Sequence, residues 1–364
     1  MTTICCGKRS GRLRVLLLVP NPRLALQTNY VPGEQPNPFD FWQILAQHGV
    51  DVDIMDPTPW PLNPLARWHS FYRSLDPYRA LKVLLYRRDY DLLISAGDGS
   101  AALPILLRRL FRFKTPILIW DLSPATRWRL RKRIQDYVLP RLTAVIAINS
   151  GQVRHIAERC GPGVQVVVSG YAIDTAFYRP WDCGLEPYLL AVGDDPGRDF
   201  PTLLDAIDDL DVKLVIKTRA ALPMNRRRDQ YVRQIADRLD YPAFRELYGR
   251  CRFVILPLKP DTLNASGVTT LAEAFSMGKA VIVSSSDGIR DFLLPDENCI
   301  VVPAGDPNAL RAAIVRLLRE PETCERLGRN ARRFAEGHCS KTVLAERLAM
   351  MLRSYVAKDL ACQC

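Results

Sequence analysis

The chain has 364 residues, and since single domains usually contain roughly 100–200, its length predicts two domains. Hydrophobic residues make up 48% of the chain and charged residues 24%, a balance that excludes a disordered polypeptide. The longest apolar runs fall short of the roughly 20 residues that span a bilayer. A formal net charge of +11 indicates an anionic partner, which is a nucleic acid, a membrane face or a phosphorylated substrate.

The N-terminus places several cations before a short apolar stretch, 13–19. This stretch is too short for a secretory signal and runs into Pro20 and Pro22 without a small-residue cleavage site. We therefore expect a buried strand here and a cytoplasmic protein. The ten cysteines contain no C-x-x-C pair and the four histidines do not cluster near them, so we expect reduced thiols and no zinc site.

Strand-like apolar runs alternate with helix-length segments along nearly the whole chain, which is typical of parallel sheets with crossover helices. The predicted strands of the first half are 14–19, 52–55, 92–95, 117–120, 144–148 and 164–168, with helices at 40–48, 77–87, 101–111 and 123–141. The predicted strands of the second half are 188–192, 213–216, 253–256, 280–284 and 299–302, with helices at 201–207, 242–249, 268–277, 308–319 and 322–336. The predicted fold class is α/β, with two Rossmann-like doubly wound domains facing across a cleft.

The domain boundaries follow from breaks in this rhythm. Pro180, Trp181 and Gly184 interrupt any regular pattern between the two halves, so the seam lies there. We expect an N-terminal domain at 1–170, a linker at 171–186, a C-terminal domain at 187–340 and a terminal helix at 341–364 that packs back on the N-terminal domain. A shared ligand is expected in the cleft, beyond the carboxyl ends of the strands.

The most informative segment is 264–283, where a small Gly-containing loop leads from a buried strand into a helix. Such a loop exposes backbone N–H groups at a helix N-terminus, which favours phosphate. Glu273 lies about two turns into the helix among apolar neighbours, and a buried acid there needs a partner such as a pair of ligand hydroxyls. The alternative is an exposed glutamate on an amphipathic helix.

This segment resembles the signature of the retaining GT-B glycosyltransferases of the glycogen-synthase-like class (family 4, also called glycosyl transferases group 1). In that class a Gly-containing loop precedes L-x-E-A-F/M-x-x-G-x-x-V-I. Stretches at 169–180, 192–207 and 286–310 resemble the same class, so the likeness covers about 140–345, while the first 140 residues match only in their α/β rhythm. The class carries a second glutamate eight positions before the first, and that position is Ala265 here.

The resemblance implies a donor site for a nucleoside-diphosphate sugar. The glutamate at Glu273 would bind the ribose hydroxyls, and the loop and helix start would supply the other contacts, from Asn264, Ser266, Gly267, Val268 and Thr269. The implied reaction transfers the sugar with retention to an acceptor glycan or glycolipid, such as a lipid-linked or polysaccharide precursor. No metal is strictly required, and no cofactor is needed beyond the nucleotide sugar as co-substrate.

The resemblance also implies cations beside the departing diphosphate. Arg198 stands near the position of the family's phosphate-binding lysine, and Lys217 ends the next strand. Where the family usually carries an arginine, this chain has Asp194. Guanidinium and ammonium groups suit a pyrophosphate. The alternatives are that Arg198 pairs with Asp194 or Asp195, and that Lys217 is a solvated strand end.

Two polar residues of the first half are candidates for contacts near the transferred sugar or the acceptor. Asp98 lies in a loop between a strand and a helix, and it either faces the sugar as a catalytic group or caps the helix. His69 lies in an aromatic and basic stretch, 67–73, as an acceptor contact or as a packed or surface histidine.

Basic residues concentrate in the first half, in segments that also carry Trp, Tyr, Phe and Leu: 67–73, 81–88, 106–114 and 127–133. Such segments bind anionic membranes, with each cation contributing roughly 1 kcal/mol. Nucleic acid is an alternative, although no recognised nucleic-acid-binding motif is present, and a solvated basic face is another. Since the resemblance implies lipid-linked acceptors, we expect peripheral contact with the inner face of the cytoplasmic membrane and no nucleic-acid partner.

Two other functions fit part of this pattern. A nucleotide-sugar epimerase has the same architecture, and incubation with donor alone would distinguish it from a transferase. A non-catalytic module that binds a sugar nucleotide or a membrane is compatible with the departures at Ala265 and Asp194.

Overall fold

The computed structural model describes residues 11–22, 31–37, 40–68, 70–122, 128–225, 228–260 and 265–361. Its N-terminal unit contains a six-stranded parallel sheet in the order β2-β1-β3-β4-β5-β6. The strands are β1 (Leu13–Leu18), β2 (Val50–Met55), β3 (Leu92–Ser95), β4 (Ile117–Trp120), β5 (Ala144–Ala147) and β6 (Gln165–Val168). Central strands such as β3 and β5 are buried at every residue because helices cover both faces of the sheet, which explains their continuous apolar sequences.

The C-terminal unit repeats this plan in the order β12-β11-β10-β7-β8-β9. Its strands are β7 (Tyr188–Val192), β8 (Lys213–Lys217), β9 (Val232–Ile235), β10 (Val254–Leu256), β11 (Val281–Ser284) and β12 (Ile300–Val302). The predicted fold class of two doubly wound α/β units is confirmed. The strand β9 was missed because it pairs only with β8 at the sheet edge and exposes Arg233 and Gln234, so its sequence has no apolar run.

The helices fall between the strands. In the N-terminal unit they are α2 (Asp40–Gln47), α3 (Ser70–Ser74), α4 (Pro77–Tyr86), α5 (Asp98–Phe111), α6 (Arg129–Val138) and α7 (Val153–Ala157). The later helices are α8 (Phe200–Ile207), α9 (Tyr241–Arg250), α10 (Val268–Ser276), α11 (Pro307–Arg319), α12 (Pro321–His338) and α13 (Lys341–Ala361). Within the described residues, none of these helices combines the length and apolarity needed to cross a bilayer.

Local sequence explains where several helices begin. The helices α4, α8, α9 and α11 each start at an aspartate whose side chain accepts a backbone N–H of the first turn, with proline at the first or second helical position. Aspartate satisfies a backbone donor that the helix leaves open, and proline lacks the N–H that would be unpaired there. The predicted helix 123–141 begins only at Arg129 among the described residues.

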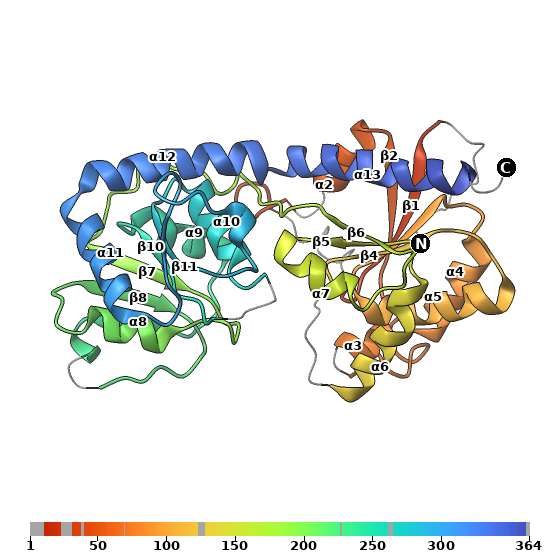
Figure 1. Ribbon diagram of the computed structural model, residues 1–364, viewed down its shortest axis with the longest axis horizontal. Helices are drawn as coiled ribbons and strands as arrows, with labels where there is room; N and C mark the ends of the chain where they lie inside the picture. Colours follow the sequence, from red (N-terminus) through yellow and green to blue (C-terminus); the bar gives the residue numbers. More distant parts are fainter. Residues whose placement is uncertain are drawn as a thin grey trace.

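The last helix returns to the first domain. Figure 1 shows α12 along the C-terminal unit and α13 continuing beside α2 over the N-terminal unit. Leu348 and Leu352 of α13 are fully buried in the same core as Val15 of β1. At the junction, Lys341 donates to Asp40 and Asp174 at 2.7 and 2.9 Å. The chain therefore crosses between the units twice, and partly buried ion pairs hold this second crossing in place.

The carboxyl edges of the two sheets meet. Ser150, in the turn after β5, donates to Asp291 in the turn after β11. Tyr171, which follows β6, shares a 2.8 Å hydrogen bond with Thr269 of α10, which follows β10. Because all four residues lie beyond strand carboxyl ends, the cleft between the units has the position at which doubly wound folds bind ligands.

Candidate functional site

The chain adds strands to one side of β7 and then, from β10 onward, to the other side, so the strand order reverses between β7 and β10. The loops after these two strands lie together. Asp199 donates its backbone N–H to Pro257 at 3.1 Å, and Lys259 donates to Gly197 at 2.9 Å. Arg198 and Leu258 form an antiparallel bridge between the same loops. This contact brings the segment beginning at Gly193 against the one that leads into α10. Open α/β sheets bind their ligands at such a switch point.

Arg198 lies in the middle of this contact and is 7% exposed. Its guanidinium donates to Val192 at 2.9 Å, to Ser266 at 3.2 Å and to Thr270 at 3.1 Å, and it pairs with Asp195 at 3.0 Å. Burial lowers the pKa of the guanidinium. The alternative in which Arg198 pairs with Asp195 is therefore confirmed, although the same side chain also reaches the start of α10.

Gly193 allows this arrangement. Its φ is +148°, and a Cβ placed there would lie 2.0 Å from Nε of Arg198. No other residue type would leave room for the guanidinium beneath the end of β7.

The start of α10 contains residues that the sequence analysis predicts to bind the nucleotide sugar. Gly267 caps the helix with φ +88°, and no described side chain caps it by a hydrogen bond. Ser266 is 9% exposed and donates to Asp195. Val268 is buried in the core, whereas the exposed Thr269 bonds to Tyr171. A further predicted contact, Asn264, lies outside the described residues.

Lys217 ends β8 with a side chain that is 8% exposed, so the alternative of a solvated strand end is wrong. Within the described part of the chain its ammonium group has no hydrogen-bond or ion-pair partner. The neighbouring Asp194 is held by Arg219 at 2.7 and 2.9 Å. Burial would raise the pKa of Asp194, but these bonds and the nearby charge of Lys217 lower it overall. Lys217 therefore has the charge of Asp194 nearby but no direct partner in the described residues, and a bound anion would offset the cost of its burial.

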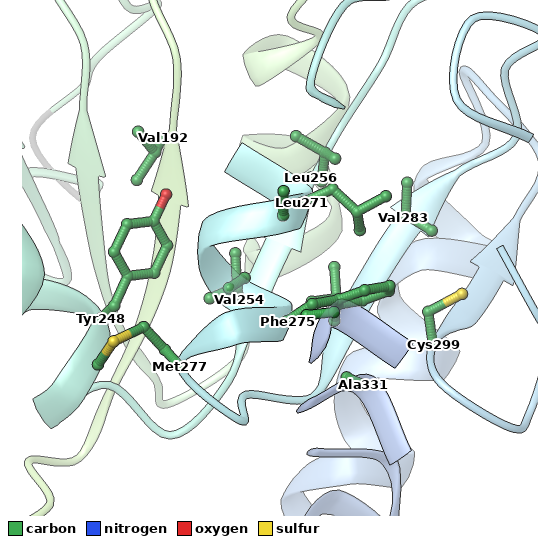
Figure 2. Close-up of a cluster of buried hydrophobic side chains, with 14 of the residues drawn as sticks. Val192, Tyr248, Val254, Leu256, Leu271, Phe275, Met277, Val283, Cys299 and Ala331 are labelled. Carbon is green, nitrogen blue, oxygen red and sulfur yellow. The ribbon is translucent and has the colours of Figure 1, made fainter. Parts of the chain in front are cut away.

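Glu273 is also buried, at 7% exposure, so the alternative of an exposed surface glutamate is wrong. Tyr248 donates its hydroxyl to Glu273 at 2.8 Å, and the hydroxyl of Tyr178 also interacts with the carboxyl group. Burial raises the pKa of Glu273 to about 7, against the opposing effect of these hydroxyls and of Arg198. Figure 2 shows the ring of Tyr248 beside α10 within the core.

Sequence reasoning missed both tyrosines because they lie far from the motif, with Tyr248 25 residues before Glu273. Their aromatic residue type was the one available signal, since a buried tyrosine needs a hydrogen-bond partner. The proposed contact of Glu273 with a ribose stays a prediction.

Asp98 is the first residue of α5, and Gly97 is the cap, so the alternative in which Asp98 caps the helix is wrong. Its carboxylate is 2% exposed and pairs with Arg131 of α6 through two hydrogen bonds of 2.9 and 3.1 Å. Its role near a sugar stays a prediction. The other N-terminal candidate, His69, lies outside the described residues.

The N-terminal side of the cleft holds a cavity of about 320 Å³ that the sequence did not reveal. It lies beyond the carboxyl ends of the first sheet and is lined by Leu17, Val19, Phe41, Trp42, Ile54, Ala96, Trp120, Asp121, Ile148, Gly170, Tyr171, Ala172, Lys341 and Leu344. Small-molecule sites typically have about 300–1,000 Å³, so this cavity is large enough for part of a substrate. In the described ranges, no group of three or more His, Cys, Asp or Glu side chains is placed to hold a metal ion.

Comparisons with known proteins agree with this geometry. The sequence profile of the family described as "Glycosyl transferases group 1" matches residues 191–320. No curated protein matches the chain by sequence. A sucrose-phosphate synthase from Thermosynechococcus elongatus has a TM-score of 0.70 at 17% identity, over 95% of this chain and 100% of its own. A glycosyltransferase from Rickettsia africae has a TM-score of 0.68 at 13% identity, over 95% and 99%.

A third structure, HepE from Anabaena in complex with UDP and glucose, has a TM-score of 0.63 at 16% identity, over 94% of this chain and 100% of its own. At sequence identities of 13–17%, the similarity to these three structures shows the fold alone. Residues 191–320 thus carry the sequence features of glycosyl transferases group 1, within a chain whose two parallel sheets form the GT-B fold.

Proposed function

We propose that this protein transfers a sugar from a nucleoside-diphosphate sugar to an acceptor bound on the N-terminal side of the cleft. One observation carries the proposal: positive charge and the N-terminus of α10, which no described side chain caps, lie together near the switch point of the C-terminal sheet. Lys217 is buried without a partner among the described residues, and Arg198 reaches the loop at Gly267. A diphosphate is the anion that suits such a site. The family match and the UDP that HepE binds support this assignment.

The chemical task of the site is electrostatic. When the bond between the anomeric carbon and the diphosphate oxygen breaks, the electron pair stays on the diphosphate and its negative charge grows. Lys217, Arg198 and the N–H groups of Ser266 and Gly267 would stabilise that charge. We further propose that the anomeric configuration is retained, that no metal is strictly required and that Glu273 binds the nucleotide ribose. Asp98 would then contribute near the sugar by holding the side chain of Arg131 in position through their hydrogen bonds.

A screen of nucleotide sugars tests this proposal. We expect one of the UDP, GDP or ADP sugars to raise the melting temperature, because a ligand at 100 times its Kd stabilises the folded state by roughly 2.7 kcal/mol. Donor hydrolysis or transfer should follow with the same nucleotide. Release of an epimerised donor without an acceptor would instead establish an epimerase, and binding without turnover would establish a non-catalytic module.

We propose in addition that the protein binds the inner face of the cytoplasmic membrane through its N-terminal unit. The neighbouring helices α4 and α5 each present an outward apolar stripe. On α4 the stripe is Tyr78, Leu81 and Leu85, and on α5 it is Leu106, Leu110 and Phe111, all between 38% and 69% exposed. The same two helices and the residues that follow them also carry Lys82, Arg88, Arg109, Arg112 and Lys114. Exposed leucines flanked by cations suit an anionic bilayer, and nucleic acid offers no apolar partner for them.

A liposome experiment tests this surface. Leu110→Glu, at a side chain that is 69% exposed, is expected to reduce co-sedimentation with anionic liposomes about tenfold or more, because it removes apolar contact and adds repulsion. The matched control is Leu185→Glu in the linker, which is 72% exposed and makes the same change of charge. Equal loss in both variants, or wild-type recovery that does not distinguish anionic from neutral liposomes, would contradict the proposal. So would tighter retention of the protein on nucleic acid.

A further inference from the structure

The N-terminal cavity is lined mainly by apolar side chains. Besides aliphatic side chains from four strands or their ends, it contains three aromatic residues in mutual contact. The ring centroids of Phe41 and Trp42 are 4.9 Å apart, and Trp120 lies 5.7 and 6.2 Å from them. Such a surface favours a ligand that removes apolar area from water.

Few polar groups of the lining are free for a ligand. Lys341 is occupied by the carbonyl of Asn37 and by the carboxylates of Asp40 and Asp174, at 2.7, 2.7 and 2.9 Å. The hydroxyl of Tyr171 is bonded to Thr269. A saccharide buried here would leave most of its hydroxyl groups without partners, and each unpaired group is costly.

Besides the indole N–H groups of Trp42 and Trp120, which have no hydrogen-bond partner in the described part of the chain, Asp121 is the exception. It follows β4 at the cavity wall and is exposed, and its carboxylate forms no hydrogen bond or ion pair with another described side chain. Its φ of +59° lies in the left-handed region, which residues other than glycine enter at a cost and which is common at functional sites. The backbone N–H of Asp121 donates to Ile146 at 3.1 Å, which anchors this conformation.

The cavity adjoins the donor loop. Tyr171 lines the cavity and also bonds to Thr269 in the first turn of α10. A group bound in the cavity therefore lies beside the start of the helix to which the diphosphate is assigned.

From this geometry we infer that the acceptor is a hydrophobic alcohol, whose hydrocarbon group fills the N-terminal cavity and whose hydroxyl donates a hydrogen bond to Asp121. This inference rests on the proposed transferase function, since it names the acceptor class for that reaction. It distinguishes between acceptors, because a free sugar or a polysaccharide end would find little to bind here.

A homologous series of straight-chain primary alcohols tests the inference on the full chain. Because Trp42 and Trp120 line the cavity, binding is followed by intrinsic fluorescence and by calorimetry. Each buried methylene should tighten binding about fourfold, so burial of three gives about 60-fold. Octan-1-ol has five more methylenes than propan-1-ol, so if three of them are buried it should bind about 60-fold more tightly. We expect methyl glucoside not to compete.

Two variants assign the binding to this cavity. Ala96→Phe fills it from the end of β3 and is expected to abolish the dependence on chain length. Ala221→Phe, in an exposed loop of the other unit, is the matched control and should retain it. Asp121→Asn, in which asparagine tolerates the same backbone conformation, should weaken octan-1-ol about tenfold by removing the charged acceptor.

The outcomes separate the two proposals. Affinity that does not rise with chain length, octan-1-ol binding that survives Ala96→Phe, or competition by methyl glucoside would each overturn the acceptor assignment. Loss of every nucleotide-sugar thermal shift, with alcohol binding intact, would overturn the transferase proposal.

Discussion

Replacing Lys217 with methionine is expected to lower turnover at saturating donor by about 100- to 1,000-fold, the usual effect of removing one group that stabilises developing negative charge. Methionine keeps the length and apolar stem of the side chain while removing the ammonium group. Affinity for the free nucleoside should change little, because the interaction strengthens only as the bond to the diphosphate breaks. Steady-state kcat and calorimetric nucleoside binding measure the two effects separately.

The stability of this variant provides a second readout. Lys217 is 8% exposed and unpaired among the described residues, so its removal should leave the melting temperature unchanged or raise it. Lys259→Met is the control, since Lys259 lies nearby on the same pair of loops but bonds to the carbonyl of Pro196. Wild-type turnover in Lys217→Met, or equal losses in both variants, would show that Lys217 does not stabilise the leaving group.

Arg198 should behave differently because the fold uses it. Its guanidinium bonds to Asp195, Ser266 and Thr270, so truncation would leave two buried hydroxyls without this donor and a partly exposed carboxylate without its cation. Because the Asp195 side chain is 40% exposed, we expect a loss of stability smaller than the roughly 3–5 kcal/mol that breaking a fully buried pair costs. The substitution Arg198→Lys retains the charge, and we expect it to reduce kcat with a smaller loss of stability, measured by turnover and thermal unfolding on the same samples.

Replacing Glu273 with glutamine is expected to cause a large loss of nucleotide affinity. If the carboxylate binds the ribose hydroxyls, loss of its charge should weaken nucleotide binding by about 10- to 100-fold. Alanine is a poorer test, because it would also leave the buried hydroxyls of Tyr248 and Tyr178 without an acceptor. Calorimetry at pH 8, where the wild-type carboxyl group is mostly ionised, measures the affinity. Unchanged nucleotide affinity would remove Glu273 from the donor site.

The same substitution should alter the pH dependence of stability. The pKa of Glu273 is raised from 4.5 to about 7 by burial, so between these values the folded state holds a proton that the unfolded state has lost. The free energy of unfolding should therefore fall as pH rises through this window and level off above it. In Glu273→Gln this component of the slope should be absent. Denaturant titrations of both proteins at pH 4.5, 6 and 8 measure the difference.

Most of the fold was predictable because its determinants are local. Parallel strands covered on both faces need continuous apolar runs, and aspartate followed by proline begins helices by satisfying or removing backbone donors. The edge strand β9 was not predicted because it pairs with one strand and is only partly buried, so its sequence has no continuous apolar run. Glu273 was identified by its apolar neighbours and by the family motif, without knowledge of its partners.

The sequence by itself determined the two α/β units, the basic character of the first half and the helix that carries Glu273. Only the tertiary structure decided which side chains meet. The loops after β7 and β10 bring Arg198 into contact with Ser266, 68 residues later in the sequence. Tyr248 likewise contacts Glu273, 25 residues later. The cavity around Trp120 combines residues from strands, a linker and the last helix. Such contacts depend on the order of strands in a sheet and on a returning helix, which local patterns of polarity do not encode.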